Sequence, residues 1–484
     1  MTDGSRSTAG GEWYDRFDRR DFLRGAAMLG TAVALGACTG TSAKRSAPTS
    51  GPTSAPRATT TTLAPKRTRR PGERPDPTKP EGTDTLPQIE HIVVVMMENH
   101  SFDNYLGVIG RGDGLPVDAS GKPKVALSDG NGGYIHSFRM PTTCQLKSLP
   151  SQSWPASHRA LGHGDNSGFV EACGPSAMGY FTPEDIPFYA GLARTYPLCD
   201  RWFASCLAQT YPNRRFLMAG TAAGIIDTTT ASILAPPPPN GVIMERLEAH
   251  RISWMNYYTD LPATFLFPQF MVNRPAHRAH IDRFYRDAAA GTLPGVSFVD
   301  PGFDTDESEE NPADIRVGER FTAKVVHAVT TGKAWDKTLL VWLYDEGGGY
   351  YDHVPPPRVI APDTIAPRLP AGFPPGGYDQ YGFRVPAVIV SPYARRDYVS
   401  HAVHDHTSVL KLIETKWNLP ALTFRDANAD DLLDALDLSA PPAFAEPPAL
   451  PEPALGLNGP LPAADCGGKG AGAIPPPGAR TTTP

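Results

Sequence analysis

An unbroken apolar run at 92–97 constrains the fold of this chain more than any other feature of its sequence. Continuous apolarity, in contrast to alternation, indicates a strand that is buried on both faces, as in a parallel sheet covered by helices. Comparable runs lie at 296–299, 338–344 and 385–390, the last of which contains a proline. The sequence therefore predicts at least four core strands.

Helical patterns lie between these runs, at 186–196, 317–330 and 407–417. The first is preceded by 182–185, where a threonine, a proline and an acidic residue have the order of a helix start. The 46 glycines and 52 prolines exclude a coiled coil or a simple helical bundle. Alternating strands and helices predict an α/β fold with a doubly wound, mostly parallel sheet sandwiched by helices.

The charge distribution argues against a nucleic-acid partner. The chain has 45 basic and 51 acidic residues and a net charge of −6. Basic residues outnumber acidic ones in 39–87, so the rest of the chain is more acidic than the total indicates. An acidic surface repels phosphate backbones.

The N-terminal region resembles an export signal. Arg19 and Arg20 precede a short apolar run that is too brief to span a bilayer, and the pair resembles a twin-arginine signal. The residues ending at Cys38 resemble a lipobox, which predicts cleavage before Cys38 and a lipid on its thiol. We expect an exported protein that is either anchored at the cell surface as a lipoprotein or released to the periplasm or medium. A short amphipathic helix with a chance arginine pair is the alternative.

Composition divides the chain into four parts. Residues 1–38 are the export signal, and 39–87, rich in Pro, Thr and Arg, form a predicted disordered linker. One catalytic domain is predicted at 88–440, and 441–484 form a flexible tail rich in Pro and Gly. Without Cys38 an odd number of cysteines remains, so at least one thiol is free or pairs between chains. A local Cys199–Cys206 pair is possible, but spacing alone does not decide it; the others are Cys144, Cys173 and Cys466.

Polar residues with oxygen ligands follow three of the apolar runs. Glu98 and Asn99 follow the first, Asp345 and Glu346 follow 338–344, and Asp300 follows 296–299. In open α/β sheets functional residues gather at the carboxyl ends of the strands. Carboxylates that converge there repel each other unless a cation is present, and such ligands suit Mg²⁺, Ca²⁺ or Mn²⁺. The alternative is that each acid is solvated or caps a helix.

A second segment surrounds Thr210. Pro212 fits the first turn of a helix, which places the Thr210 hydroxyl at the helix N-terminus, where backbone N–H groups attract an anion. Held beside a metal, this hydroxyl can lose its proton and attack phosphorus, while Arg214 clamps the phosphoryl oxygens. In the alternative interpretation Thr210 is only a helix cap and Arg214 a surface charge.

The third candidate set consists of histidines. His353 follows Asp352, and His404 and His406 flank Asp405 at a predicted helix start. Histidines beside strand-end acids can protonate a leaving oxygen or complete a metal shell. The alternative is that they are surface histidines, and for His158 spacing alone decides nothing.

Four ordered segments together carry a family resemblance: 97–107, 178–220 with its Gln-Thr-Tyr-Pro-Asn-Arg core, 344–357 and 405–410. They resemble the bacterial phosphoesterase family of phosphatidylcholine-type phospholipases C and AcpA-like acid phosphatases. The resemblance covers most of residues 88–438. It implies an alkaline-phosphatase-like fold and a substrate that is a phosphate ester or a phospholipid.

The resemblance also implies the roles of individual residues. One divalent metal (Ca²⁺, Mg²⁺, Mn²⁺ or Zn²⁺) is expected on Glu98, Asn99, Asp345 and Glu346, and Thr210 is the expected nucleophile and a further ligand. Thr210 would form a phospho-enzyme that water resolves. Histidines matching His158, His353 and His406 are expected around the phosphate, in leaving-group or charge-stabilising roles.

The chain departs from the family pattern at three places. Family members often carry His or Asn where this chain has Gly347, Asp-His-Pro near 308–312, and Gly-Lys-Met-Asp-Gly-Phe at 164–169. Loss of a histidine near Glu310 would remove a proton donor or reshape the substrate pocket. The expected metal and nucleophile positions are kept.

Two other functions remain open. The Thr-Tyr-Pro-Asn-Arg core resembles the sulfatase pattern, although Thr210 is no precursor of formylglycine. A surface lipoprotein that binds a phosphorylated ligand without turnover is the other alternative. Four aromatic residues are candidates either for stacking on a choline head group or for the core: Trp202, Tyr211, Trp254 and Tyr257.

Overall fold

The computed structural model describes residues 68–145, 150–462, 466 and 474–484. The predicted export signal, with Arg19, Arg20 and Cys38, lies outside these residues, as does most of the predicted linker. In the part of the chain that is described, no helix is both long and apolar enough to cross a membrane.

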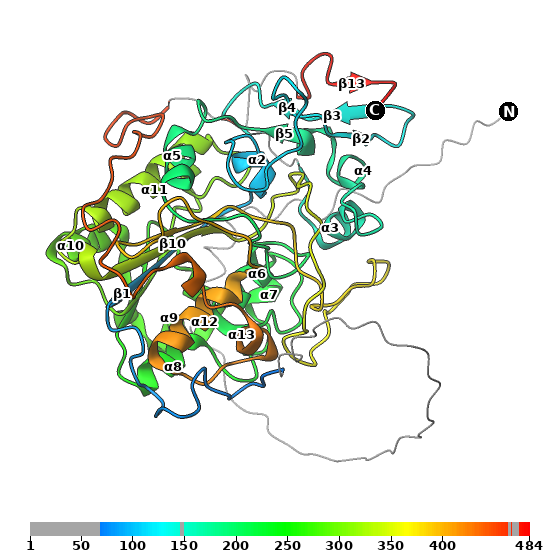
Figure 1. Cartoon of the computed structure of the whole chain (residues 1–484). Coiled ribbons are helices and arrows are strands. Elements are labelled where there is room, and N and C mark those ends of the chain that lie inside the picture. Colours follow the sequence, from blue (N-terminus) through cyan, green and yellow to red (C-terminus); the bar gives the residue numbers. More distant parts are fainter. Residues whose placement is uncertain (1–67, 146–149, 463–465, 467–473) are drawn as a thin grey trace, which may run out of the picture. The chain divides into compact units, whose positions relative to one another are not determined.

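An eight-stranded sheet forms the centre of the molecule (Figure 1). Its strands are β1 (His91–Met97), β6 (Leu198–Cys199), β7 (Trp254–Tyr258), β8 (Arg278–His280), β9 (Val296–Asp300), β10 (Thr338–Tyr344), β11 (Ala387–Val390) and β12 (Val399–Ser400). Their spatial order is β12-β6-β11-β10-β1-β9-β7-β8. Only β11 runs antiparallel to its neighbours among these strands, so the predicted mostly parallel sheet is confirmed.

The four apolar runs of the sequence form β1, β9, β10 and β11. Strand β1 lies in the middle of the sheet, paired in parallel with β10 on one side and β9 on the other. Its residues from Ile92 onward are buried, as are all residues of β9 and β10. Burial on both faces explains why these strands are continuously apolar.

Helices cover both faces of the sheet, which confirms the doubly wound arrangement (Figure 1). One layer contains α5, α10 and α11, and the other contains α6, α8, α12 and α13. The helices are α2 (Phe102–Leu106), α3 (Trp154–Ala160), α4 (Phe169–Cys173), α5 (Pro187–Thr195), α6 (Thr210–Ala219), α7 (Thr230–Ile233), α8 (Ile243–Ala249), α9 (Pro268–Asn273), α10 (Ile281–Ala290), α11 (Ile315–Thr330), α12 (His406–Trp417) and α13 (Phe424–Asn428). Two small sheets contain β2 (Ala126–Ser128), β3 (Tyr134–His136), β4 (Phe138–Arg139), β5 (Gly179–Tyr180) and β13 (Arg480–Thr481).

The predicted helices are present, but the predicted start of α5 is wrong. Helix α5 begins at Pro187, with Ile186 as the residue before it. Thr182 and Asp185 instead close a separate turn, in which the backbone N–H and hydroxyl of Thr182 donate to the Asp185 carboxylate, both at 2.9 Å. Pro187, the first residue of α5, has the fixed φ that suits the first turn of a helix.

The compact body extends beyond the predicted domain at its N-terminal side. Residues from Arg69 onward belong to one compact unit. The Gly72 N–H donates to the Ala421 carbonyl at 2.8 Å, and the Thr85 N–H donates to the Lys416 carbonyl at 2.7 Å. Residues 69–87 therefore pack against the body and are not part of an extended linker.

The C-terminal segment also packs against the body wherever it is described. Phe444 is buried, and its carbonyl accepts a hydrogen bond of 2.9 Å from the Trp335 indole. Strand β13 pairs with β3, and Cys466 forms a disulfide with Cys144. The prediction of a flexible tail is therefore wrong for these residues. A proline-rich segment does not form a helix, but it can still pack against the body.

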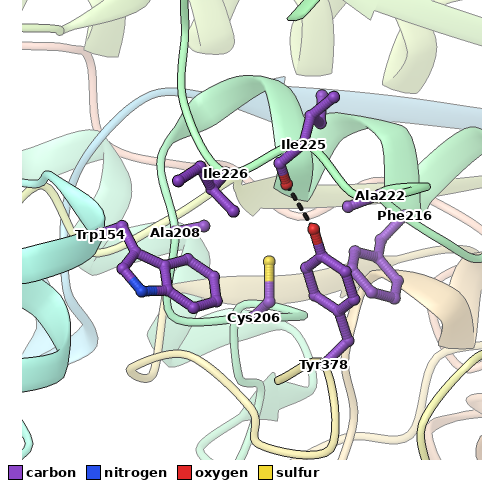
Figure 2. Close-up of a cluster of buried hydrophobic side chains, with 8 residues drawn as sticks. All are labelled: Trp154, Cys206, Ala208, Phe216, Ala222, Ile225, Ile226 and Tyr378. Atoms are coloured by element: carbon purple, nitrogen blue, oxygen red, sulfur yellow. Dashed lines mark hydrogen bonds between the residues drawn. The ribbon is translucent and has the colours of Figure 1, made fainter. Parts of the chain in front are cut away.

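The possible Cys199–Cys206 pair does not exist in the structure. Both thiols are free and buried, and burial raises the pKa of each above its usual value. Cys206 belongs to an apolar cluster behind α6, in which it lies between Trp154 and Tyr378 (Figure 2). The Tyr378 hydroxyl donates to the Ile225 carbonyl at 2.6 Å, which fixes one side of this cluster. Helix α6 packs on this cluster through Phe216.

Candidate active site

The predicted oxygen ligands meet at the carboxyl edge of two neighbouring strands. Met97 of β1 lies opposite Tyr344 of β10, so Glu98 and Asn99 leave the sheet beside Asp345 and Glu346. All four of these polar residues are buried, with at most 5% of the surface of any one exposed. The sequence-based prediction that these residues gather at one place agrees with the geometry.

The backbone at Asn99 turns sharply as the chain leaves β1. Asn99 has a φ of 71°, in the left-handed region that residues with a side chain rarely adopt. Its N–H donates to Asp345 Oδ1 at 3.2 Å, and the Glu346 N–H donates to the same oxygen at 2.8 Å. These two hydrogen bonds fix one oxygen of Asp345 and hold the two strand ends together.

Side-chain oxygens crowd together around Asn99. Its Oδ1 lies 3.2 Å from Asp345 Oδ1 and 3.1 Å from Glu346 Oε1, although neither an amide oxygen nor an ionised carboxylate can donate a hydrogen bond. Turning the amide by half a rotation would place its NH₂ there as a donor to both carboxylates. A cation bound among the three oxygens would also remove their repulsion, without any rotation of the Asn99 amide. The donor chemistry therefore fits a hard divalent metal.

The charges of this edge are incompletely balanced. Burial raises the pKa of Asp345 to about 7, partly opposed by Arg214 and reinforced by Glu98. Burial and the neighbouring Asp345 raise the pKa of Glu346 well above its usual range. Like-charged carboxylates removed from water in this way ionise together only if positive charge is supplied.

Arg214 supplies part of that positive charge. Its Nε donates to Asp345 Oδ2 at 3.1 Å, and its Nη1 lies 3.5 Å from Asp300 Oδ1. Its Nη2 donates to the carbonyls of Met96 and Met97 at 3.2 and 3.1 Å and lies 3.7 Å from Glu98 Oε1. Because these contacts direct the guanidinium toward the protein, they assign Arg214 to neutralising the strand-end acids and not to the predicted clamp on a phosphoryl group.

Thr210 is the first residue of α6, as the sequence predicts. The residue is 4% exposed, and its hydroxyl lies 3.5 Å from Asn99 Oδ1, next to the crowded oxygens. Free N–H groups and the positive end of the helix dipole surround this position. The structure therefore brings the predicted nucleophile together with the predicted metal ligands.

Asn213 holds the loop that leads into α6, a role that the sequence analysis missed. Its Oδ1 accepts from the Cys206 N–H at 3.0 Å, and its Nδ2 donates to the carbonyls of Ala208 and Gln209 at 2.8 and 3.1 Å. The side chain is fully buried. The sequence shows that Asn213 lies in the same motif as Thr210 and Arg214. Its hydrogen bonds depend on the conformation of the loop before α6, which the sequence does not show.

The described contacts of the predicted histidines are with other residues than Thr210. His158 stacks on the Trp154 ring, with 4.0 Å between centroids, and its Nδ1 bonds to the Trp154 carbonyl at 2.9 Å. His353 bonds through Nδ1 to Asp103 Oδ2 at 2.7 Å and approaches Asp113 through Nε2 at 3.3 Å. The contacts described for these two histidines do not include Thr210 or the strand-end acids.

His406 contacts the backbone of Asp345 and the side chain of Trp202. Its Nε2 bonds to the Asp345 carbonyl at 2.7 Å, and the Trp202 indole lies 3.4 Å from its Nδ1. Because the indole can only donate, Nδ1 accepts and Nε2 carries the proton. Burial lowers the pKa of His406 to about 4, so the ring is neutral and both nitrogens are occupied. The contacts assign His406 to positioning Asp345 and not to proton transfer to a leaving group.

Two further features around the site were not anticipated. The Gln152 side-chain amide lies 3.2 Å from that of Asn99, and its Nε2 donates to Glu310 Oε1 at 3.2 Å. Glu310, which lies where the chain departs from the family pattern, is thus linked to Asn99 through the Gln152 side chain. Elsewhere, Asp103 and Asp352 approach His353, but the Arg384 guanidinium pairs with both acids at 3.2 and 2.8 Å. The buried Arg384 side chain therefore already supplies positive charge to the group of Asp103, Asp352 and His353.

Most of the aromatic candidates for head-group stacking are core residues. Trp202, Trp254 and Tyr257 are at most 2% exposed. Trp254 stacks on His277 with centroids 4.3 Å apart, and the Tyr257 hydroxyl donates to Asp287 at 2.7 Å. Only Tyr211, which follows Thr210 and is partly exposed, remains beside the site.

Removing the charge of Arg214 should destabilise the fold strongly. We expect Arg214→Met to lower the free energy of unfolding by about 3–5 kcal/mol, because it leaves buried acids unpaired. The control is Arg139→Met, which breaks an ion pair to Asp185 whose arginine side chain is 52% exposed. That change should cost less than about 1 kcal/mol. Equal losses in urea unfolding would show that Arg214 does not compensate the strand-end acids.

Gly348 packs so closely on Asn99 that a side chain is excluded. A Cβ on Gly348 would lie 2.0 Å from the Asn99 carbonyl oxygen, and its φ is 63°. A Cβ on Gly347 would approach no atom closer than 3.5 Å. We expect Gly348→Ala to cost about 1 kcal/mol or more in urea unfolding and Gly347→Ala to have little effect. An unchanged free energy of unfolding in Gly348→Ala would contradict the close approach. The space beside Gly347 agrees with the side chain that family members often carry at this position.

A doubly wound sheet whose carboxyl edge carries a buried hydroxyl and converging oxygen ligands has the architecture of an enzyme centre. The sequence profile of the Phosphoesterase family matches residues 89–420, which is most of the chain. The chain therefore belongs to the Phosphoesterase family and is a phosphoric ester hydrolase. The resemblance noted from the four sequence segments is confirmed.

Named relatives agree with this assignment. Phospholipase C B of Mycobacterium tuberculosis is 30% identical over 427 residues, covering 75% of this chain and 80% of the relative. Non-specific phospholipase C1 of Arabidopsis thaliana is 31% identical over 409 residues, covering 76% and 75%. Among solved structures, a protein of the alkaline phosphatase superfamily from Vibrio parahaemolyticus matches with a TM-score of 0.39 and 10% identity over 75% of each chain.

Proposed function

We propose that this chain is an exported, metal-dependent phosphoric ester hydrolase of the phospholipase C or acid phosphatase type, with Thr210 as its nucleophile. The observation that carries the proposal is the position of Thr210. Its buried hydroxyl begins α6 and lies 3.5 Å from the Asn99 side chain, at the edge where Asp345 and Glu346 also converge. The phospholipase C names of the relatives support phospholipid or related phosphate esters as substrates.

In the proposed reaction Thr210 Oγ1 loses its proton to water and attacks phosphorus, the bond from phosphorus to the leaving alcohol oxygen breaks, and the alcohol departs with a proton taken from water. Water then cleaves the phospho-threonine, which releases the phosphate product and restores the Thr210 hydroxyl. A divalent ion held by Glu98, Asn99, Asp345, Glu346 and Thr210 would supply positive charge that favours the ionised hydroxyl and the phosphoryl oxygens. The N-terminus of α6 stabilises negative charge at the same place. Burial excludes bulk water and strengthens these electrostatic interactions.

Other residues prepare this arrangement. Arg214 pairs with Asp345 and Asp300 and so limits the repulsion between carboxylates. His406 holds the Asp345 carbonyl, and Asn213 holds the loop before Thr210. We therefore propose that Arg214, His406 and Asn213 act on the position and charge of the site residues.

The substrate class is tested by a panel of chromogenic esters. We expect the protein to release p-nitrophenol from its phosphate or phosphorylcholine ester, in the presence of a divalent metal, and not from p-nitrophenyl sulfate. Preference for the sulfate ester would favour a sulfatase-like hydrolase. If the folded, metal-loaded protein turned over none of these esters and no phosphatidylcholine, a binding protein without turnover would be the better interpretation.

Export is proposed from the sequence alone. Arg19 and Arg20 resemble a twin-arginine signal, and Cys38 ends a lipobox-like stretch. Replacing both arginines by lysine should retain the protein inside the cell, whereas replacing Cys38 by alanine should release it from membranes without blocking export. Unchanged export of the double lysine variant would contradict the twin-arginine route.

A further inference from the structure

A second group of potential metal ligands lies at the connection between β12 and α12. His404 stands in this connection. Asp430 follows α13, and Asp434 lies within a short 3-10 helix at Leu433–Ala435. One donor atom from each of the three residues lies within 4.8 Å of the other two. None of the three belongs to the proposed active site.

Two atoms of this group lack the hydrogen bonds that buried polar atoms normally make. His404 is 0% exposed, and its Nδ1 has no hydrogen-bond partner. Asp434 Oδ1 is also buried without a partner. Nδ1 of His404 lies 3.6 Å from Asp430 Oδ1, so it points into the acidic group. Unpaired buried polar atoms are costly, and two of them on residues of one group of potential ligands point to a missing partner.

The hydrogen bonds of Ser400 fix the protonation of His404. The Ser400 hydroxyl donates its single proton to Asp434 Oδ2, which also accepts from the Tyr398 hydroxyl at 3.1 Å. His404 Nε2, 3.0 Å from Ser400 Oγ, must therefore be the donor in that contact. In a neutral ring the Nδ1 lone pair then faces the Asp430 carboxylate.

The surroundings favour that neutral ring. Burial lowers the pKa of His404, although the carboxylates of Asp430, Asp434, Asp405 and Asp431 oppose the shift. Asp405 pairs with Arg425 at 3.3 Å. In the part of the chain that the structure describes, no lysine or arginine lies within ion-pair distance of Asp430 or Asp434. A lone pair and two uncompensated carboxylates thus converge without a cation of the protein.

We propose that His404 Nδ1, Asp430 Oδ1 and Asp434 Oδ1 bind a divalent transition-metal ion, such as Zn²⁺ or Mn²⁺, at a site separate from the active centre. Imidazole favours zinc and related metals over calcium or magnesium, and carboxylates are compatible with both. Two ligands of one tetrahedral zinc ion lie about 3.3 Å apart, close to the 3.6 Å between His404 Nδ1 and Asp430 Oδ1.

The neighbouring residues provide what such a site requires. Ser400 holds the ring of His404 in the tautomer that leaves Nδ1 free to bind, and Ser400 with Tyr398 orients the Asp434 carboxylate. The Asp430 side chain is 41% exposed, which gives the ion a route from solvent and room for a water ligand. The ion would fasten the turn that follows α13 to the segment that leads into α12.

Zinc binding by the full-length chain tests the site. After removal of metals, the parent protein and Asp430→Asn are titrated with Zn²⁺ by calorimetry, and bound zinc is counted after dialysis. We expect Asp430→Asn to hold about one ion per chain fewer than the parent, or to bind that ion roughly tenfold or more weakly. Because the comparison is a difference, it does not depend on how many ions the active centre binds.

Asp431→Asn is the matched control. Asp431 is the next acid in the same turn, but it lies outside the group of three ligands, and both of its oxygens accept hydrogen bonds, from the Leu433 N–H and the Thr415 hydroxyl. Asp430 accepts one described hydrogen bond, through Oδ1 from the Leu432 N–H at 3.0 Å. This variant should bind zinc like the parent, whereas Asp434→Asn should lose the same ion as Asp430→Asn. Equal stoichiometry and affinity in the parent, Asp430→Asn and Asp434→Asn would overturn the proposal. An equal loss in Asp431→Asn would also overturn it, since general acidity of the turn would then explain the binding.

Discussion

Replacing Thr210 with alanine is expected to reduce turnover of a p-nitrophenyl phosphate ester by at least about 10³-fold. The change removes the hydroxyl of the first residue of α6, which lies 3.5 Å from Asn99 Oδ1. Substrate binding should persist, because the helix N-terminus and the strand-end oxygens remain. The loss should therefore appear in kcat and not in KM.

Thr210→Ser is the matched control for this prediction. It keeps the hydroxyl and removes one methyl group, so it should retain much of the activity. Both variants should unfold at nearly the same urea concentration as the parent protein. If Thr210→Ala kept activity within a few-fold of the parent, Thr210 would not be the nucleophile.

Removing divalent metal is the second change with a large expected effect. We expect chelation to abolish ester turnover and an added divalent metal to restore it. Asp345→Asn should require a higher metal concentration for half-maximal activity, because it removes charge from a residue whose oxygens lie 3.2 Å from Asn99 Oδ1 and 3.1 Å from Arg214 Nε. The measurement is activity against metal concentration for the parent and the variant.

An acid on the surface provides the control for this titration. Glu90 pairs with Lys337 at 2.7 Å, and both side chains are about half exposed. Glu90→Gln should leave the metal requirement unchanged. Full activity of the chelated parent, shown by elemental analysis to be metal-free, would contradict the metal requirement, and an unchanged requirement in Asp345→Asn would remove Asp345 from the ligand set.

The central sheet and its functional edge could be predicted because their signals are local. Continuous apolar runs mark β1, β9, β10 and β11, and the polar residues that follow two of these strands meet because β1 and β10 are parallel neighbours in register. The helix start at Thr210 was also readable from Pro212. In each case a short stretch of sequence determines both the element and where it ends.

The roles of Arg214 and the histidines could not be predicted because they depend on distant contacts. Arg214 is directed toward carboxylates and carbonyls from three different strands, so only the fold shows that its donors are occupied. His406 looks like a proton donor in the sequence, but its neighbours Trp202 and Asp345 occupy both nitrogens. The packing of 69–87 was hidden for the same reason, since Gly72 and Thr85 bond to residues more than three hundred positions away.

The most direct measurement is trapping of the phospho-enzyme. The metal-loaded protein is mixed with a phosphate ester, quenched in acid within the first turnovers, digested and analysed by mass spectrometry. We predict a gain of about 80 Da, the mass of one phosphoryl group, on the peptide that contains Thr210, and no gain in Thr210→Ala. Turnover without any phosphorylated Thr210, or phosphorylation of another residue that persists in Thr210→Ala, would contradict the proposed mechanism.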